Sequence, residues 1–582
     1  MRYLYLLFCF LLVFVLCLPF NAFGFTETKS YILITQEDIS KLGAGTIQDV
    51  LNIVPGVNAG ETSISIRGIS KVRVVLDGKT INDPTSSHGG VKWEHVSLAS
   101  VESVKVYRNS GSASFGSDAS GGVIVITSKE KNDTSGFVKT YYGSYNTFYT
   151  YLSCQSRIDK LSLSAATGID RTFGFRPNSK KKKIMIHGDA AFVVDTETKF
   201  SFSAGKISEK RGSPGLDAYP TPLASYEYDL FSTLLTVELP GFTNKLSYTD
   251  ATKKNTNPAK NLDKELRIEK IRDELLKTVS WDLPVNLAIG SGYEMEKFES
   301  TGFSDGKEHN IWVNTILSKQ FDSITIGKAP LEISLGARLE KYSEFGSYFS
   351  PELNLGIQNK VWKVRLGCSQ THNMPSFYQR YYESTSVKAN PFLAPEQADN
   401  ISLGFSHRPC SRISYDISLF YNQITDRITF LRKGPVGSYV NLGRVIYKGV
   451  DVSVDALLLK HLKLKTTYTY LDAKDKETGL FLSSKSRHKA RANLVYNPDN
   501  PFSFRLSVKY ASKVYANKAN TKKLDAYTLG NFRIEYKQKF FNMENPLTIF
   551  AEVKNITDEF FLYPDGYSAA PRTWIAGFKA RF

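Results

Sequence analysis

Apolar and polar residues alternate along most of the chain, from about residue 134 to residue 582. Within residues 462–471, for example, Leu464 and Tyr468 fall on one face of an extended chain, while Lys465 falls on the other. A period of two predicts β-strands that have one apolar and one polar face. We therefore expect a long series of strands in this region.

The connections between these strands alternate in length. Short turns, at 158–160, 240–241 and 460–461, alternate along the chain with longer loops such as 209–225 and 372–398. Short turns on one rim and long loops on the other are typical of a transmembrane β-barrel, whose strands need about 9–11 residues each. A water-soluble sandwich also alternates, but rarely over such a length. The pattern predicts an antiparallel membrane barrel of about 22 strands over residues 134–582.

The last predicted strand supports a membrane barrel. Its alternate residues share one face that is largely aromatic, and the sequence ends on Phe. Such a strand resembles the C-terminal signal of bacterial outer-membrane proteins. The residues of this face are Trp574, Ala576, Phe578, Ala580 and Phe582.

Residues 25–130 follow a different pattern, which predicts a small mixed α/β domain. Short apolar runs alternate there with Gly, Asn, Asp and Ser, so strands and tight turns are expected. The predicted strands are 31–35, 63–67, 72–76, 101–107 and 123–127, and the predicted helical segments are 36–39 and 46–53.

Residues 1–24 have the features of a secretory signal. Arg2 precedes an apolar run, and small residues precede a cleavage site after Gly24. An uncleaved membrane anchor is the alternative, because the apolar run is almost long enough to span a bilayer. Pro19 favours cleavage. We expect the mature chain to begin near Phe25, which intact-mass measurement would test.

The composition limits the possible functions. The chain has a formal net charge of +17, from 74 Lys+Arg and 57 Asp+Glu. A positive net charge could indicate nucleic-acid binding, but the expected export from the cytoplasm argues against a nucleic-acid partner. The five Cys and eight His residues are scattered without metal-ligand spacing, and no nucleophile motif or carboxylate pair is evident. We therefore expect no metal site, no cofactor and no enzymatic activity.

An ordered series of short motifs across the N-terminal domain resembles the plug of TonB-dependent outer-membrane receptors. The likeness continues in the barrel, and the short loops are most similar to the cobalamin-receptor branch. The matching stretches are Ile34–Ile39, Val54–Val57, Ile66–Gly68, Val75–Gly78, Val101–Arg108, Phe115–Thr127, Asn390–Glu396, Asn441–Gly443, Val553–Asp558 and Pro571–Arg572.

The resemblance implies a 22-stranded barrel whose lumen holds the plug, in the outer membrane beside lipopolysaccharide. It also implies a monomer that takes up a scarce metal chelate, either cobalamin or a ferric siderophore, with energy from a periplasmic TonB protein. A passive plugged porin or surface-binding protein would share the fold without energy coupling. Some cobalamin receptors carry an acidic calcium-binding loop, whereas the corresponding stretch here, Thr172–Lys183, has no acidic ligand set.

Four charged residues of the plug are candidates for contact with the barrel wall. Arg67 and Arg108 belong to the matching motifs, and Asp77 and Glu102 are nearby anions. Bidentate pairs between arginine and barrel carboxylates would hold the plug in place. Solvation of these side chains in a wet lumen is the alternative.

The substrate is expected at the outer tips of the plug and at a long barrel loop. The two plug tips are 58–65 and 82–92, whose polar residues could hydrogen-bond a ligand. Tyrosines in the loop 372–398 could stack on a flat ligand, or could belong to the membrane's aromatic girdle. His372 at the loop's edge keeps haem as a minority interpretation. The candidates are Asn58, Thr62, Asn82, Ser86, Ser87, His88, Tyr378, Tyr381 and Tyr382.

Four consecutive lysines at 180–183 are interpreted as part of a solvated outer loop. Attraction of an anionic ligand or of lipopolysaccharide phosphates is the alternative.

The segment 25–32 is the candidate for contact with TonB, through Glu27, Thr28, Tyr31 and Ile32. Strand addition requires a free extended segment, yet few residues separate the expected cleavage site from the first plug strand. Either this compact segment peels away from the plug to act as a TonB box, or coupling is weak or absent.

Overall fold

The computed structural model describes residues 31–582, apart from short gaps. The expected signal segment 1–24 lies outside the described residues, as do the candidates Glu27, Thr28, Ser87 and His88. The gaps are 43, 87–88, 94–95, 109–110, 130–132, 281–284, 303–304, 327–328, 385, 540–545 and 564–565.

The N-terminal domain folds around a five-stranded mixed sheet with the order β1-β6-β7-β4-β5. Strands β4 and β6 have the bounds that the sequence pattern predicts. Its elements are β1 Tyr31–Thr35, α2 Gln36–Leu42, α3 Ile47–Leu51, β2 Val57–Ala59, β3 Ile64–Ile66, β4 Val72–Leu76, β5 Lys79–Thr80, β6 Val101–Tyr107, α4 Ser112–Phe115 and β7 Gly122–Ser128.

A compact apolar core holds this domain together. Val74, Val104 and Ile124 from the central strands are fully buried, together with Val50 and Leu51 of α3. Thr46 begins α3 as its N-cap, because its hydroxyl accepts a hydrogen bond from the Asp49 amide and the Asp49 carboxylate accepts one from the Thr46 amide. The plug is therefore a folded unit with its own core.

The rest of the chain forms a closed antiparallel barrel in which β34 pairs with β8. Twenty-two long strands make the wall, as the alternation predicts. They are β8 Ser135–Gly143, β9 Thr147–Ile158, β10 Leu161–Thr172, β11 Lys181–Val193, β12 Lys199–Gly212, β15 Ser225–Leu239, β16 Phe242–Asn257, β17 Leu262–Ser280, β18 Val285–Ser300, β19 Gly306–Ile326, β20 Ala329–Tyr342, β21 Gly346–Gln358, β22 Trp362–Asn373, β24 Glu396–Cys410, β25 Ile413–Lys433, β26 Val436–Leu459, β27 Leu462–Asp475, β28 His488–Tyr496, β29 Phe502–Ala511, β32 Tyr527–Gln538, β33 Leu547–Lys554 and β34 Thr573–Arg581.

The two faces of each wall strand differ in burial. On β25, Leu419 and Tyr421 point outward and are 54% and 39% exposed, whereas Ser418 and Asn422 point into the lumen and are 3% and 2% exposed. An apolar outer face beside a polar inner face is what a lipid-embedded barrel requires. Among the described residues, no helix is both long and apolar enough to cross a membrane.

The two rims of the barrel differ as expected. Two residues connect β9 to β10, β15 to β16 and β26 to β27, which places these short turns on one rim. The opposite rim carries the longer loops and their small elements. These are β13 Gly215–Leu216, β14 Tyr219–Pro220, α5 Phe377–Tyr381, β23 Val387–Lys388, β30 Val514–Tyr515 and β31 Lys523–Leu524.

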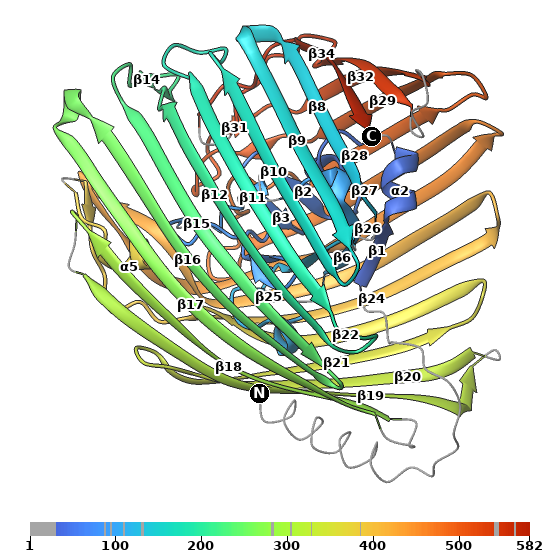
Figure 1. Cartoon of the computed structure of the whole chain (residues 1–582). Coiled ribbons are helices and arrows are strands. Elements are labelled where there is room, and N and C mark those ends of the chain that lie inside the picture. Colours follow the sequence, from blue (N-terminus) through green and yellow to red (C-terminus); the bar gives the residue numbers. More distant parts are fainter. Residues whose placement is uncertain are drawn as a thin grey trace.

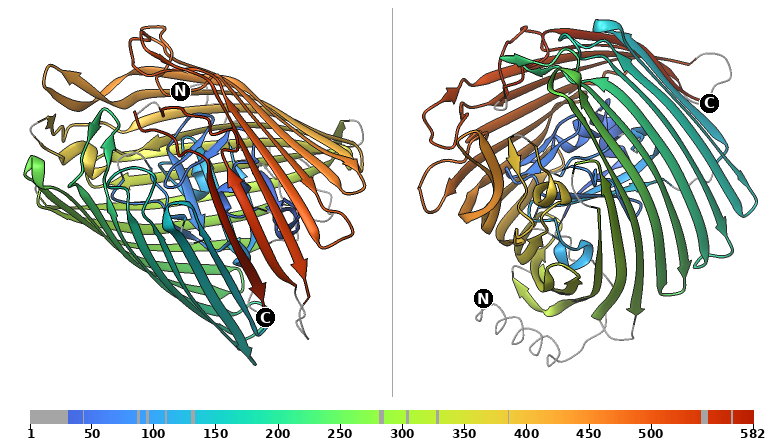
Figure 2. Two further views of the ribbon diagram at one scale, coloured as in Figure 1. Left: turned by 90° about the horizontal axis from the view of Figure 1, so that it is seen from above. Right: turned by 90° about the vertical axis from the view of Figure 1, so that its left-hand side faces the viewer.

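The plug lies inside the ring of barrel strands (Figure 1). Views along the two perpendicular directions both show it enclosed by the wall (Figure 2). Helix α4 contacts β19, β20 and β21 at one side of the lumen. A barrel of this size encloses more space than wall side chains can fill, so the plug determines whether the lumen is open.

Candidate functional site

Arg67 of the plug is paired with a carboxylate of the barrel wall. Its Nε lies 2.8 Å from Oδ2 of Asp451 on β26, and both side chains are almost completely buried, at 1% and 0% exposed. Its Nη2 donates to Ser418 Oγ at 2.8 Å, and its guanidinium lies 4.4 Å from the centroid of the Phe420 ring. Burial lowers the pKa of Arg67 to about 10, so it remains a cation at neutral pH.

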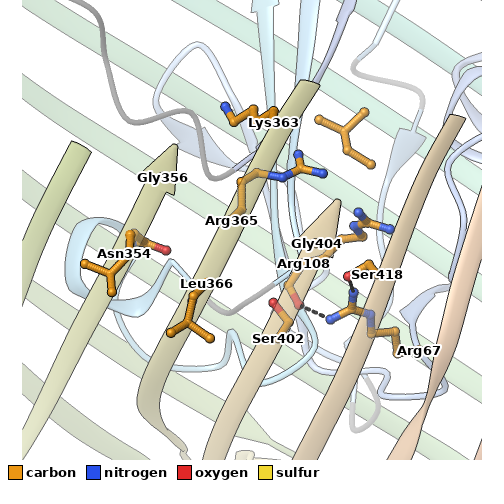
Figure 3. Close-up of a pocket in the computed structure, with 13 residues that line it drawn as sticks. Arg67, Arg108, Asn354, Gly356, Lys363, Arg365, Leu366, Ser402, Gly404 and Ser418 are labelled. Atoms are coloured by element: carbon orange, nitrogen blue, oxygen red, sulfur yellow. Dashed lines mark hydrogen bonds between the residues drawn. The ribbon is translucent and has the colours of Figure 1, made fainter. Parts of the chain in front are cut away.

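Arg108 extends this ion-pair cluster to a second carboxylate. Its Nη2 lies 3.0 Å from Oδ1 of Asp416 on β25, and its Nη1 lies 3.4 Å from Asp451 Oδ2. Its backbone carbonyl accepts a hydrogen bond from Arg67 Nη1 at 3.3 Å. Arg365 of β22 pairs with the other oxygen of Asp416. Figure 3 shows Arg67, Arg108 and Arg365 converging on this region from plug and wall.

Gly56 permits the close approach of plug and wall at this cluster. Its φ of 81° lies in the left-handed region, and a Cβ there would be 3.0 Å from Asp451 Oδ1. Its amide donates to Thr469 Oγ1 at 3.0 Å, and Thr469 in turn donates to Asp451 Oδ1 at 2.9 Å. Plug backbone, plug arginines and wall thus share one carboxylate.

The other two plug anions lie elsewhere. Both oxygens of Asp77 accept hydrogen bonds from Ser128, one from its amide and one from its hydroxyl, each at 2.8 Å. Asp77 therefore joins two parts of the plug. Glu102 is exposed on β6. The predicted contact set is thus divided: the two arginines meet barrel carboxylates, whereas Asp77 and Glu102 occupy other surroundings.

Several plug–barrel contacts carry no recognisable sequence motif. Arg491 of β28 donates to the carbonyls of Asn52 and Val57, at 2.7 and 2.8 Å. Lys79 of the plug donates to Ser232 Oγ at 2.9 Å, and burial lowers its pKa to about 8. Further contacts join Ser117 to Glu340, Ala113 to Glu352 and Lys139 to Gly45.

The two expected plug tips lie side by side at the rim of long loops. The Val91 amide donates to the Thr62 carbonyl at 3.0 Å, and Glu61 pairs with Lys181 at the outer end of β11. The Lys181 ammonium lowers the pKa of Glu61 to about 2. This contact ties the tip 58–65 to the outer wall.

The polar candidates on these tips differ in their surroundings. Asn58 accepts a hydrogen bond from Arg491 Nη2 at 3.0 Å. The amide of Asn82 bonds to the backbone of Val72 and Val74, at 2.9 and 2.7 Å, so it braces the strand β4. Ser86 Oγ accepts from the Gly90 amide at 2.9 Å, within its own loop.

The candidate tyrosines belong to or follow α5, which caps the barrel wall. Tyr381 stacks on Phe298 of β18 with ring centroids 5.4 Å apart, and Tyr378 stacks on Tyr382 at 4.3 Å. Arg380 of α5 is buried and pairs with Glu308 of β19. The helix is therefore docked on the wall, and Tyr378 lies toward Lys253 of β16.

One other sequence expectation is corrected here. His372 lies next to the last residue of β22, at the edge of the long loop, and is buried in the lumen wall, where its carbonyl accepts from the Asp118 amide at 2.9 Å. The lysine run is not a solvated loop throughout, because Lys181 begins β11 and Lys183 is 3% exposed beside Glu209. Alternation along β11 turns Lys181 and Lys183 inward, which local charge density does not reveal.

The expected TonB-contact residues Tyr31 and Ile32 lie in β1 at the edge of the plug sheet. β1 pairs antiparallel with β6, with Ile32 opposite Val106. Among the residues that the structure describes, no strand pairs with its other edge. Ile32 also borders the pocket beside Arg67 and Arg108.

No group of three or more His, Cys, Asp or Glu side chains within the described ranges could hold a metal ion. The site instead offers ion pairs, hydrogen bonds and aromatic surfaces.

A 22-stranded barrel closed by a separately folded plug defines the class of plugged outer-membrane receptors. Two family models match the chain: the TonB-dependent receptor plug domain over residues 26–123, and the TonB-dependent receptor-like β-barrel over residues 189–556. The chain belongs to the TonB-dependent receptor family. It is accordingly an outer-membrane protein of a family whose members interact with TonB.

Relatives of this chain include transporters and iron-regulated proteins. The vitamin B12 transporter BtuB of Photobacterium profundum is 24% identical, and the match covers 97% of this chain and 98% of that protein. The iron-regulated outer membrane virulence protein of Vibrio cholerae is 22% identical, with 95% and 92% covered.

Solved structures share the fold. A mutant of the ferric enterobactin receptor PfeA of Pseudomonas aeruginosa superposes with a TM-score of 0.78 at 17% identity, covering 96% of this chain and all of that one. The siderophore receptor PirA of the same organism gives 0.73 at 18% identity, with the same coverage.

Proposed function

We propose that this protein actively imports a scarce metal chelate, cobalamin or a ferric siderophore, across the outer membrane. Family membership supports active transport, and the relatives named for vitamin B12 and for iron support the two ligand classes. The observation that carries the proposal is the buried Arg67–Asp451 pair, which fixes a folded plug inside a wide lumen.

The pair explains why transport would need energy. Removing one partner of a buried ion pair typically costs about 3–5 kcal/mol, because the other charge is left uncompensated. Movement of the plug would break this pair together with the bonds of Gly56 and Arg108. Thermal motion alone would open such a plug rarely, so an external pull is a suitable means of opening it.

The route for that pull is β1. An edge strand with one free side can accept an added strand through main-chain hydrogen bonds. TonB would pair with this edge, or with the segment preceding it, and draw the plug sheet away from the wall. We expect the protein to act as a monomer in a leaflet that contains lipopolysaccharide, because one closed barrel contains the whole path.

Growth rescue tests the proposal directly. The chain is expressed in a strain that lacks its own receptors for cobalamin and for ferric chelates, and growth is measured on each source in turn. We expect rescue on at least one source, and loss of that rescue when TonB is deleted. Rescue that persists without TonB would identify a passive plugged porin instead, and absence of rescue on all sources would contradict the transport function.

A further inference from the structure

The outer half of the lumen contains a group of basic side chains on neighbouring strands. Lys489 and Arg491 lie two residues apart on β28, and Lys509 lies directly opposite Arg491 on β29. Thr467 and Thr469 of β27 are the partners of Arg491 and Lys489 in the register, and both are buried in the lumen. All of these side chains therefore face the plug.

A fourth basic residue joins them from the loop between β27 and β28. Lys485 lies against the plug, with its Cδ 3.6 Å from the position that a Cβ of Gly68 would occupy. Lys489 and Arg491 line a small cavity of about 20 Å³, bordered by Val54, Gly56 and Val57 of the plug, which has room for about one water. The group thus lies beside the contact between plug and wall at Gly56 and Gly68.

These charges lack the compensation found elsewhere in the lumen. Neither β28 nor β29 contains an acidic residue. Among the described residues, Lys485, Lys489 and Lys509 form no ion pair, although Lys509 lies 5.6 Å from the Tyr527 ring centroid. The guanidinium of Arg491 donates its hydrogen bonds to plug carbonyls and to the side chain of Asn58.

On the opposite wall, basic residues in the lumen form ion pairs with acidic residues of the neighbouring strand. On β17 and β18, Lys270 lies opposite Glu296 and Arg272 opposite Glu294, with ion pairs of 2.6 and 2.9 Å. Like charges placed directly across two strands destabilise a sheet, whereas opposite charges stabilise it. The Arg491–Lys509 pairing therefore costs stability that the β17–β18 arrangement avoids.

The surroundings of Lys485 disfavour its charged form. Burial, with the nearby Arg427 and Lys489, lowers the pKa of Lys485 to about 7. An anion bound beside Lys485 would stabilise its ammonium form. Protonation of Lys485 would in turn strengthen binding of the anion.

We infer that Lys485, Lys489 and Lys509 form an anion-binding face, and that the imported chelate is a polyanion that enters along the β27–β29 side of the plug. This inference rests on the proposed transport function and narrows its ligand to a metal complex that carries several negative charges. On the opposite wall, Lys270 and Arg272 are already paired with glutamates.

Binding to the purified full-length protein in detergent tests the ligand class without TonB. The probes are a ferric tris(catecholate), which is a polyanion, a ferric tris(hydroxamate), which is neutral, and cyanocobalamin, which is neutral. We expect the catecholate complex to bind at least about tenfold more tightly than either neutral probe, with an affinity that falls as salt is added. The inference would be overturned if a neutral probe bound as tightly as the catecholate complex or more tightly. It would also be overturned if none of the three probes bound.

A pair of matched triple variants tests the face itself. Lys485→Gln/Lys489→Gln/Lys509→Gln should lose at least about tenfold in affinity for the catecholate complex. Lys388→Gln/Lys476→Gln/Lys522→Gln removes the same charge from exposed positions and should bind as the wild type does. Heat-modifiable gel migration checks that both fold. Equal affinities for the two variants would overturn the proposed face, while TonB-dependent growth rescue would still decide the transport function separately.

Discussion

Arg67 and Asp451 are 384 residues apart in the sequence, yet Arg67 Nε and Asp451 Oδ2 lie 2.8 Å apart in a buried contact between plug and wall. Arg67 also has a φ of 53°, in the left-handed region that residues other than glycine rarely occupy. Such backbone costs about 1–3 kcal/mol and persists only where the surroundings hold it. The pair therefore fixes both a side chain and a strained turn.

Replacing Asp451 should loosen the plug. Asp451→Asn leaves the Arg67 cation buried without its counter-charge, which we expect to weaken plug docking by about 3–5 kcal/mol. The readout is single-channel conductance in planar bilayers, where the variant should show openings that the wild type lacks. Asp455→Asn on the same strand is the control, because its partner Lys465 is only partly buried. A silent Asp451→Asn channel would contradict the structural importance of the pair.

Deleting the plug should leave a stable pore. The barrel closes through its own hydrogen bonds, with β34 paired to β8, and the plug has a separate core. A variant without residues 31–130 should therefore insert in the outer membrane and conduct ions continuously. Failure to insert, or insertion without conductance, would show that plug and barrel depend on each other more than these contacts indicate.

Changing the edge strand should separate binding from transport. Ile32→Pro removes a backbone donor and fixes φ in β1, which would disturb strand addition by TonB. Uptake should collapse while ligand binding to whole cells persists. Ile32→Val, which keeps the strand, should transport normally. Full transport by the proline variant would place the TonB contact elsewhere or argue against energy coupling.

Anion binding should weaken as pH rises through neutrality. The pKa of Lys485 is lowered to about 7, so its ammonium is present below that pH and is lost above it. Affinity for the ferric tris(catecholate) should fall between about pH 6 and pH 8. Lys485→Arg should bind with less dependence on pH, because a guanidinium stays protonated. An identical pH profile for the two proteins would exclude Lys485 as the titrating group.

The sequence predicts the strands well because alternation is a local property. β4 and β6 have the predicted bounds, and Arg67 and Arg108 are marked by motifs that resemble a known family. Their partners Asp451 and Asp416 are not marked, because the register of the whole barrel and the docking of the plug bring them into place. No local pattern contains that information.

The same limit applies to the direction of single side chains. Asn82 lies in a polar plug tip that suggests ligand binding, yet its side chain is hydrogen-bonded to the backbone of β4. The lysine run reads as solvated, yet the alternation of β11 turns Lys183 inward. No local pattern marks the anion-binding face, because Lys485, Lys489 and Lys509 are unremarkable individually. The absence of acidic residues from β28 and β29 was the available signal.

The seam between β34 and β8 has a consequence for biogenesis. Ile575 lies opposite Gly143 and Arg581 opposite Phe137, so the cylinder is sealed by the strand that the ribosome makes after all other wall strands. Until then, β8 and β33 each present an unsatisfied edge, which hydrocarbon does not tolerate. A premature stop before Thr573 would remove this closing strand, and we expect the truncated molecule not to complete insertion.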